Sequence, residues 1–476
     1  MTKNLKMAAA GIAVLGLAYA VPALAQAPAA AAPFQPTAAM VNKGDTTWML
    51  ISSVLVLMMS VPGLALFYGG LVRTKNMLSI LMQVLMIVSV ASLVWVCWGY
   101  SLAFTAGSGA TAPFIGGLSK VMLKGVDATT LAATFSNGVY LPEYAFVIFQ
   151  MTFACITPAL IVGAFAERVK FTPLMIFVVA WLTLAYFPIA HMVWYWAGPD
   201  FLPANPTDTG YLWGKGALDF AGGTVVHINA GIAGLVGCLI IGPRVGYNKD
   251  PMPPHSLTMT MIGASLLWVG WFGFNAGSNL EANGVTTVAF INTYVATAAA
   301  AVAWAVIEQF VHKKPSLLGA ATGAVAGLVA ITPASGYAAP MTSIILGFVA
   351  SGVCFVFVTT VKRALKYDDS LDVFGVHCVG GIVGALGTAI CAAPSLGGQG
   401  YFDYTVSPAG FFPEKYDIVA QLLVQAQAVG ITLIWSGAVS AVLFLALKYT
   451  IGLRPSAEVE AEGLDINEHG ERAYNY

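Results

Sequence analysis

The chain has 476 residues, of which 58% are hydrophobic and only 9% are charged, and its formal net charge is −1. Soluble domains carry about 25% charged residues, so this deficit excludes an ordinary soluble protein and indicates a polytopic membrane protein. The near-neutral charge also excludes the basic surface by which proteins bind nucleic acid.

The N-terminus has the composition of a secretory signal peptide. Two lysines precede an apolar stretch at residues 7–20, and small residues at 23–25 form an A-x-A cleavage site. We therefore expect residues 1–25 to be removed. Residues 26–45 are rich in Ala and Pro and should form a periplasmic linker with nothing to bury.

Eleven apolar segments follow, each long enough to cross a bilayer, for which about 20 residues suffice. We expect these spans at residues 46–72, 77–104, 143–166, 171–196, 218–242, 257–279, 287–311, 316–335, 341–361, 372–393 and 418–448. The sequence thus predicts an all-α polytopic membrane protein with eleven transmembrane helices within residues 46–450, followed by a tail at 451–476.

The basic residues predict how the spans are oriented. Cleavage of the signal peptide places the mature N-terminus outside, and eleven crossings then place the C-terminus inside. Fourteen Lys and Arg residues fall on the inner side in this arrangement and only five on the outer side. This excess agrees with the positive-inside rule.

Two histidines, His227 and His377, lie in matching copies of one motif. An Asp precedes each His by eight positions, at Asp219 and Asp369. Glycines follow each His by four, seven and ten positions, at Gly231, Gly234 and Gly237 in one copy and at Gly381, Gly384 and Gly387 in the other. Because the histidines lie in the fifth and tenth spans, the sequence predicts an inverted 5+5 repeat plus one extra helix, with a site between the halves.

Helix geometry predicts that these two histidines meet near the bilayer midplane. At 1.5 Å per residue, His227 lies roughly 12 Å below the outer end of its helix and His377 roughly 12 Å above the inner end of its own. In a hydrocarbon core of about 30 Å they would be only about 6 Å apart along the membrane normal. The glycines would let neighbouring helices approach closely.

A transport pathway explains the histidine pair better than packing does, because ionisable residues within spans are costly and usually mark such a path. The alternative is a pair of hydrogen-bonded core histidines. Burial away from acids favours neutral rings, and a neutral pair that shares one proton keeps one outer donor and one outer acceptor. A catalytic zinc normally needs three protein ligands. The repeat supplies two, so we expect neither a metal nor another cofactor.

Two aspartates, Asp219 and Asp372, lie where spans begin. A helix N-cap contributes about 1 kcal/mol, and this is the role that we favour for Asp372. Asp219 is expected on the outer side, where it could also stabilise an arriving cation. The sequence supports the cap and the cation role of Asp219 about equally.

Aromatic residues cluster near the outer ends of three spans. The clusters are at residues 149–153 and 271–278, and Trp194 ends another span on the same side. Aromatic faces attract a cation that is losing its water, and Ser278 adds a hydroxyl acceptor. The aromatic belt at a membrane interface explains the clusters almost as well.

Five segments resemble motifs of the ammonium transporter (Amt/Mep/Rh) family, and of its bacterial Amt branch in particular. They are residues 149–157, 190–194, 218–229, 270–278 and 372–377. The likeness extends from about residue 46 into the tail. It implies a homotrimer of eleven-span protomers, each with its own pore, in a bacterial inner membrane.

The resemblance also implies roles for individual residues. The matching residues are Phe149, Trp194 and Ser278 at an outer ammonium-recruitment site supported by Asp219, Phe153 and Phe274 at an aromatic gate, and His227 and His377 along the pore. Two outer loops, 105–142 and 197–217, are longer than the family needs.

The tail adds a possible partner. Residues 462–465 and 468–471 resemble the family's cytoplasmic tail, which implies docking of a trimeric PII signal protein at the cytoplasmic face. The alternative is a solvated acidic tail.

The expected function is therefore ammonium transport, in which ammonium is recruited outside and deprotonated, and ammonia passes along the histidines. A dedicated ammonium sensor usually carries an added signalling domain, and the short tail leaves no room for one. An intramembrane enzyme would need a nucleophile or a metal with an open position. Neither is visible, so we expect that the protein is not an enzyme.

Overall fold

The structure is a computed structural model that describes residues 34–404, 410–411 and 413–474. The predicted signal peptide at 1–25 lies outside the described residues. The chain divides into two compact units, Met1–Pro36 and Thr37–Tyr476, and only residues 34–36 of the first are described. The account below concerns the second unit.

Ten helical segments of the described chain are long and apolar enough to cross a membrane, and the shorter apolar helix α12 (Leu317–Ile331) brings the total to eleven. The ten are Lys43–Leu71, Thr74–Phe104, Glu143–Phe165, Phe171–Trp194, Gly223–Ile241, Leu257–Gly277, Gly284–Val311, Pro340–Leu365, Phe374–Cys391 and Ile418–Thr450. The predicted all-α class and the count of eleven are confirmed, and each segment lies close to its predicted range.

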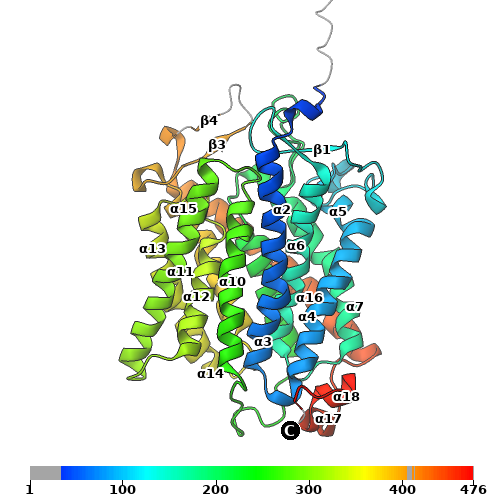
Figure 1. Cartoon of the computed structure of the whole chain (residues 1–476), viewed down its shortest axis with the longest axis vertical. Coiled ribbons are helices and arrows are strands. Elements are labelled where there is room, and N and C mark those ends of the chain that lie inside the picture. The colour runs from blue at the N-terminus through cyan, green and yellow to red at the C-terminus, as the bar shows by residue number, and fades with distance from the viewer. Residues whose placement is uncertain (1–33, 405–409, 412, 475–476) are drawn as a thin grey trace, which may run out of the picture. The chain divides into compact units, whose positions relative to one another are not determined.

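Several spans consist of two α-helices joined by a short π-helical turn, so their labels exceed the number of spans. The helices are α2 (Lys43–Met58), α3 (Ala65–Leu71), α4 (Met77–Val94), α5 (Tyr100–Phe104), α6 (Glu143–Ile161), α7 (Phe171–Trp181), α8 (Phe187–Trp194), α9 (Asn229–Ile241), α10 (Leu257–Gly277), α11 (Gly284–Val311), α12, α13 (Pro340–Val356), α14 (Lys362–Leu365), α15 (Val379–Cys391) and α16 (Ile418–Thr450). In Figure 1 the long helices run side by side along the vertical axis.

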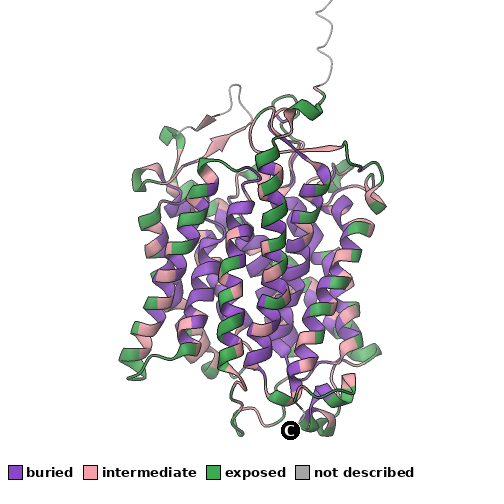
Figure 2. Cartoon of the chain, viewed as in Figure 1, coloured by how far each residue is buried: buried purple, intermediate pink, exposed green. Residues whose placement is uncertain are grey.

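We call the end of the bundle at which α2 begins the outer end, and the end at which α16 finishes the inner end. The outer end carries two short antiparallel hairpins, which pair β1 (Leu131–Ala133) with β2 (Tyr140–Pro142) and β3 (Phe402–Asp403) with β4 (Gly410–Phe411). Buried residues fill the middle of the bundle. On the outermost helices, exposed residues alternate with buried and intermediate ones (Figure 2). Exposed apolar side chains on those helices suit contact with lipid.

The two histidine segments pack against each other through reciprocal glycine contacts. A Cβ added at Gly231 would lie 2.4 Å from the backbone nitrogen of Cys378. A Cβ added at Gly381 would lie 2.9 Å from the Ile228 side chain and 3.2 Å from the His227 Cβ. The glycine four residues after each His therefore contacts the partner segment directly beside the other His. This reciprocal packing agrees with the predicted inverted repeat, in which the two halves meet near the midplane.

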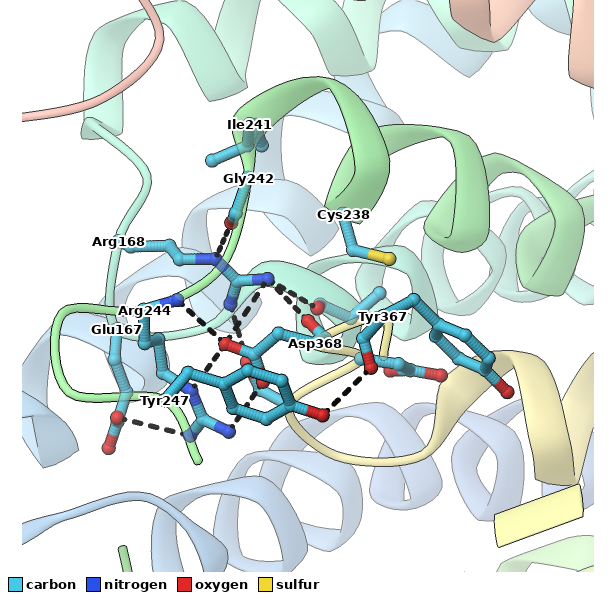
Figure 3. Close-up of polar contacts among 12 residues, drawn as sticks. Glu167, Arg168, Cys238, Ile241, Gly242, Arg244, Tyr247, Tyr367 and Asp368 are labelled. Carbon is cyan, nitrogen blue, oxygen red and sulfur yellow. Dashed lines mark hydrogen bonds and ion pairs between the residues drawn. The ribbon is translucent and has the colours of Figure 1, made fainter. Parts of the chain in front are cut away.

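Ion pairs and hydrogen bonds of buried carboxylates join four loops at the inner end, and Figure 3 shows most of them. Glu167 Oε1 accepts a hydrogen bond from the Arg73 backbone nitrogen at 2.6 Å, and Glu167 Oε2 lies 3.3 Å from Arg244 Nη1. Arg244 also pairs with Asp368 at 2.8 Å. Arg168 is fully buried and donates to the backbone oxygens of Gly242 and Asp368. Charges buried at this depth are stable only because each has partners.

The tail folds back onto the inner end as two short helices, α17 (Ala457–Glu462) and α18 (Leu464–His469), shown at the bottom of Figure 1. Asp465 accepts hydrogen bonds from the backbone nitrogens of Leu78 at 3.0 Å and Ser79 at 2.8 Å, in the first turn of α4. Glu460 accepts from the Val245 nitrogen at 2.7 Å and pairs with Arg454. Both carboxylates are almost fully buried. The tail is therefore docked rather than solvated.

Candidate functional site: an aromatic vestibule above a histidine pair

A cavity of about 810 Å³ opens at the outer end of the bundle, and we call it the vestibule. Phe153, Trp194, Asp219 and Ser278 all contribute to its wall. Its rim is built by residues 131–137, 195–217 and 399–404. The two outer loops singled out in the sequence therefore shape the entrance to the site.

The floor of the vestibule is closed by two aromatic rings. The rings of Phe153 and Phe274 stack with centroids 4.2 Å apart and an interplanar angle of 23°. Each comes from a different helix, α6 and α10, and both are buried. Phe153 lines the vestibule, and Phe274 lines a small cavity beside the histidines, so the stack lies between the two. We call this ring stack the gate.

Trp194 and Ser278 lie beside this stack. The Trp194 indole packs edge-on against the Phe153 ring, with ring centroids 5.6 Å apart. Trp194 Nε1 donates a hydrogen bond to the Asp219 backbone oxygen at 2.9 Å. The Ser278 hydroxyl donates to the Phe274 backbone oxygen at 2.8 Å. Because its proton is used there, the Ser278 oxygen is left to accept from a guest in the vestibule.

Phe149 occupies a different place from the other aromatic residues of the predicted outer site. Its ring is fully buried and is not part of the vestibule wall. It packs edge-on against Phe153, with ring centroids 5.0 Å apart. Phe149 therefore supports the gate from behind and does not face the vestibule.

The Asp219 carboxylate is used in capping. Its two oxygens accept hydrogen bonds from the backbone nitrogens of Gly222, Gly223, Thr224 and Val225 at 2.6–3.1 Å. The side chain is buried, and four donors occupy the lone pairs that a cation would use. Of the two roles predicted for Asp219, the structure supports the cap directly, and any action on a cation would be through space.

The two histidines meet below the gate. His227 Nδ1 and His377 Nδ1 lie 3.2 Å apart, and both rings are buried. Each histidine belongs to a π-helical turn, Gly223–Ile228 or Phe374–Cys378. Such turns are frequent at functional sites. The His227 Nε2 atom is buried without a hydrogen-bond partner in the described part of the chain, so it is available to a guest.

The path between gate and histidines is apolar. A cavity of about 10 Å³, close to the size of one water molecule, lies beside both rings. Its other lining residues carry no charge: Met59, Leu64, Phe67, Ile156, Leu160, Val226, Leu267, Trp271, Phe274 and Val325. Only a small neutral molecule fits such surroundings without a large desolvation cost.

At the inner end the structure corrects the predicted cap. Asp369, and not Asp372, caps the second histidine segment, accepting from the nitrogens of Val373 at 3.0 Å and Phe374 at 2.7 Å. Asp372 has a positive φ of 60° and pairs instead with Lys362 at 2.6 Å. The spacing from His377 already pointed to Asp369, because Asp219 caps the first segment from the same distance.

Comparison with known proteins identifies the family. The family model described as Ammonium Transporter Family matches residues 47–474. The chain belongs to the ammonium transporter family. An ammonium transporter of Bacillus subtilis (strain 168) is 42% identical over 434 residues, which cover 90% of this chain and 98% of the relative.

Two solved structures extend the comparison of this ammonium transporter family member to the fold. A Sensor Amt Protein matches with a TM-score of 0.77 and 27% identity, covering 90% of this chain and 98% of that one. Mep2 from Saccharomyces cerevisiae matches with a TM-score of 0.74 and 31% identity, covering 88% and 91%. The family resemblance predicted from the motifs is therefore confirmed.

Two further features of this transporter family member go beyond the sequence analysis, which placed Trp271 only in an outer aromatic cluster and did not single out Glu143. Trp271 stacks on His227 with centroids 5.3 Å apart, and its Nε1 is held by the Thr332 hydroxyl at 2.8 Å. A buried carboxylate, Glu143, lies in the vestibule wall with Lys120. Trp271 could have been found from its position three residues before Phe274, which places both on one helix face.

Proposed function

We propose that the chain recruits ammonium in the vestibule, deprotonates it above the gate, and conducts ammonia past His227 and His377. The main support for this proposal is the order in which three environments follow one another from the outer end of the bundle to the histidine pair. An aromatic, hydroxyl-bearing vestibule is followed by a closed ring stack and then by a narrow apolar passage with two neutral nitrogen bases.

Recruitment rests on the faces of Phe153 and Trp194 and on the Ser278 oxygen. Aromatic faces attract ammonium by about 0.5–2 kcal/mol each, and more strongly when the ion is desolvated. The Ser278 oxygen can accept one N–H bond of the ion, as water would. Together these groups replace part of the hydration shell before the ion reaches the gate.

Passage requires the loss of a proton. Moving an intact cation into the apolar passage would cost several kcal/mol or more. If one N–H bond of ammonium breaks and the proton stays with vestibule water, the nitrogen keeps the electron pair and neutral ammonia continues. The histidine pair shares one proton between its Nδ1 atoms, which leaves one outer donor and one outer acceptor for the passing molecule. The same pair could relay a proton separately, which would make transport electrogenic.

The surroundings of the transporter are part of the proposal. By the family resemblance it assembles as a homotrimer in a bacterial inner membrane. By the composition of the N-terminus, its signal peptide is removed first. The N-terminus would be periplasmic, and the docked tail would meet a cytoplasmic PII signal protein.

Transport is tested with purified full-length protein in liposomes. A step to higher external ammonium should raise the internal pH if ammonia passes alone, or evoke an inward current with little rise in pH if a proton is relayed with each ammonia, whereas a potassium step should do neither. Ammonium responses equal to those of protein-free liposomes would overturn the proposal.

A further inference from the structure

Outside the predicted recruitment site, the vestibule wall holds a buried carboxylate beside an aromatic ring. Glu143 is the first residue of α6, and its side chain is only 3% exposed. Its Oε1 accepts a hydrogen bond from the Tyr100 hydroxyl at 2.6 Å. A carboxylate and an aromatic face are the two groups that most strongly attract a monovalent ammonium-type cation.

The chain itself supplies such a cation to this place. The Lys120 ammonium group pairs with the same Glu143 oxygen and lies 5.8 Å from the centroid of the Tyr100 ring. Lys120, Glu143 and Tyr100 line the same cavity as Trp194 and Ser278. The Lys120 side chain is 33% exposed, so solution ions can reach the position that it occupies.

The loop that carries Lys120 is held in place by its backbone. The Lys120 nitrogen donates to the Ser101 hydroxyl at 3.0 Å, and that hydroxyl donates to the Gly117 oxygen at 2.8 Å. These bonds attach the loop to α5, next to Tyr100. The lysine is therefore delivered to Glu143 by a fixed backbone, within the outer loop 105–142.

Lys120 offsets part of the negative charge of the vestibule wall. Lys120 is the one basic residue among the described residues of the wall, which also holds the acidic residues Glu143, Asp208 and Asp219. An acidic, partly enclosed cavity concentrates cations from solution. Without Lys120, the Glu143 carboxylate would be buried and unpaired, and an external cation would be drawn to it.

We propose that Glu143 and the Tyr100 ring form a second monovalent-cation site in the vestibule, and that Lys120 fills this site as a tethered ammonium group. The lysine keeps solution cations such as potassium and ammonium out of a position beside the path to the gate. Lys120 thus acts as a specificity-determining residue.

The binding test uses purified full-length Lys120→Met, with unfolding temperature measured in potassium chloride, ammonium chloride or N-methylglucamine chloride at equal ionic strength. In N-methylglucamine the variant should unfold at a lower temperature than the wild type. Potassium or ammonium should raise its unfolding temperature saturably, by about 2 °C or more, since a ligand that binds only the folded state stabilises it. The wild type should not distinguish potassium from N-methylglucamine, and any effect of ammonium on it belongs to the proposed recruitment site.

Two controls make the test specific. Lys215→Met removes an outer lysine that lies 5.6 Å from the Tyr211 ring centroid but pairs with no carboxylate in the described chain. This variant should behave as the wild type does. The double variant Lys120→Met/Glu143→Gln should fold and should not distinguish potassium from N-methylglucamine, because its carboxylate is gone.

Three outcomes would overturn the site. The first is a Lys120→Met variant that responds equally to potassium and N-methylglucamine. The second is a double variant that still prefers potassium. The third is a single variant that folds in none of the three salts while the double variant folds, because an available cation should then have replaced the lysine.

A transport measurement tests the same site in another way, since potassium should inhibit ammonium uptake by Lys120→Met and not by the wild type. That measurement alone rests on the proposed function.

Discussion

The Nδ1 atoms of His227 and His377 lie 3.2 Å apart, so neither ring is an isolated base. One ring must donate and the other accept, and this leaves opposite hydrogen-bonding characters at the two outer nitrogens. The partner-free Nε2 of His227 belongs to this arrangement. A guest therefore meets a pair whose two members are not equivalent.

Replacing either histidine with alanine should change the transported species more than it changes folding. His227→Ala or His377→Ala leaves one buried ring nitrogen unpaired, at a cost of about 1–3 kcal/mol. We expect ammonium-evoked current to be lost or rerouted in a protein that still assembles in the membrane. Currents equal to the wild type in both variants would remove the histidines from the mechanism.

In the vestibule, Ser278 should contribute less than Trp194. A single hydrogen bond contributes about 1 kcal/mol, which corresponds to roughly a fivefold change in apparent affinity. Ser278→Ala should weaken apparent ammonium affinity by about that factor. Trp194→Leu removes a ring that contacts the gate and should lower flux or selectivity more strongly. Uptake measured over a range of ammonium concentrations checks this ranking, which fails if Ser278→Ala alone eliminates transport.

The docked tail should influence both flux and partner binding. Deletion after Leu453 should leave a folded protein with reduced or unregulated flux and weaker recovery of a PII protein on co-purification. Asp465→Asn should reproduce part of this effect, because Asp465 caps the first turn of α4. Glu471→Gln changes an exposed tail residue and serves as the matched control. Equal flux and equal PII recovery for full-length and truncated protein would show that the tail has neither role.

Acid should destabilise the inner end. Burial alone would raise the pKa of Glu167 and Asp368. Arg73 and Arg244 hold the pKa of Glu167 below its ordinary value of 4.5, and Arg244 and Arg168 hold the pKa of Asp368 below its ordinary value of 3.8. The folded chain then binds fewer protons than the unfolded chain, so stability falls as pH drops through and below those ordinary values.

Glu167→Gln tests this acid dependence. The variant should be less stable than the wild type at pH 7 by about 1–3 kcal/mol, because the half-buried Arg73 loses its carboxylate partner while Arg244 keeps Asp368. Its unfolding temperature should also fall less steeply between pH 5 and 3. Parallel pH profiles for the two proteins would contradict the explanation.

The glycine contacts between the two histidine segments should not tolerate a methyl group. In Gly231→Ala the new Cβ would lie 2.4 Å from the Cys378 nitrogen, so the segments must separate. We expect a loss of about 1–3 kcal/mol and reduced transport. Gly430→Ala is the control, because a Cβ at Gly430 meets nothing within 4 Å. The measurement is the unfolding temperature of both variants. Equal unfolding temperatures for Gly231→Ala and Gly430→Ala would show that the close packing is not required.

The spans could be predicted closely from the sequence, because the length and apolarity of a segment are local properties. The predicted span at 257–279 and the observed Leu257–Gly277 begin at the same residue. The histidine pair was also predictable. Both copies of the motif keep the same spacing, and helix geometry turns that spacing into depth within the bilayer.

Only the tertiary structure decided which groups face the vestibule and which support it. Phe149 and Phe153 are four residues apart on one helix, yet only Phe153 reaches the cavity. The pairing of Lys120 with Glu143 depends on the path of a long loop, which no local pattern encodes. Composition left a solvated acidic tail open as an alternative, whereas the Asp465 carboxylate is buried against the first turn of α4. Such contacts join residues far apart in the chain, so their geometry exists only once the helices have packed.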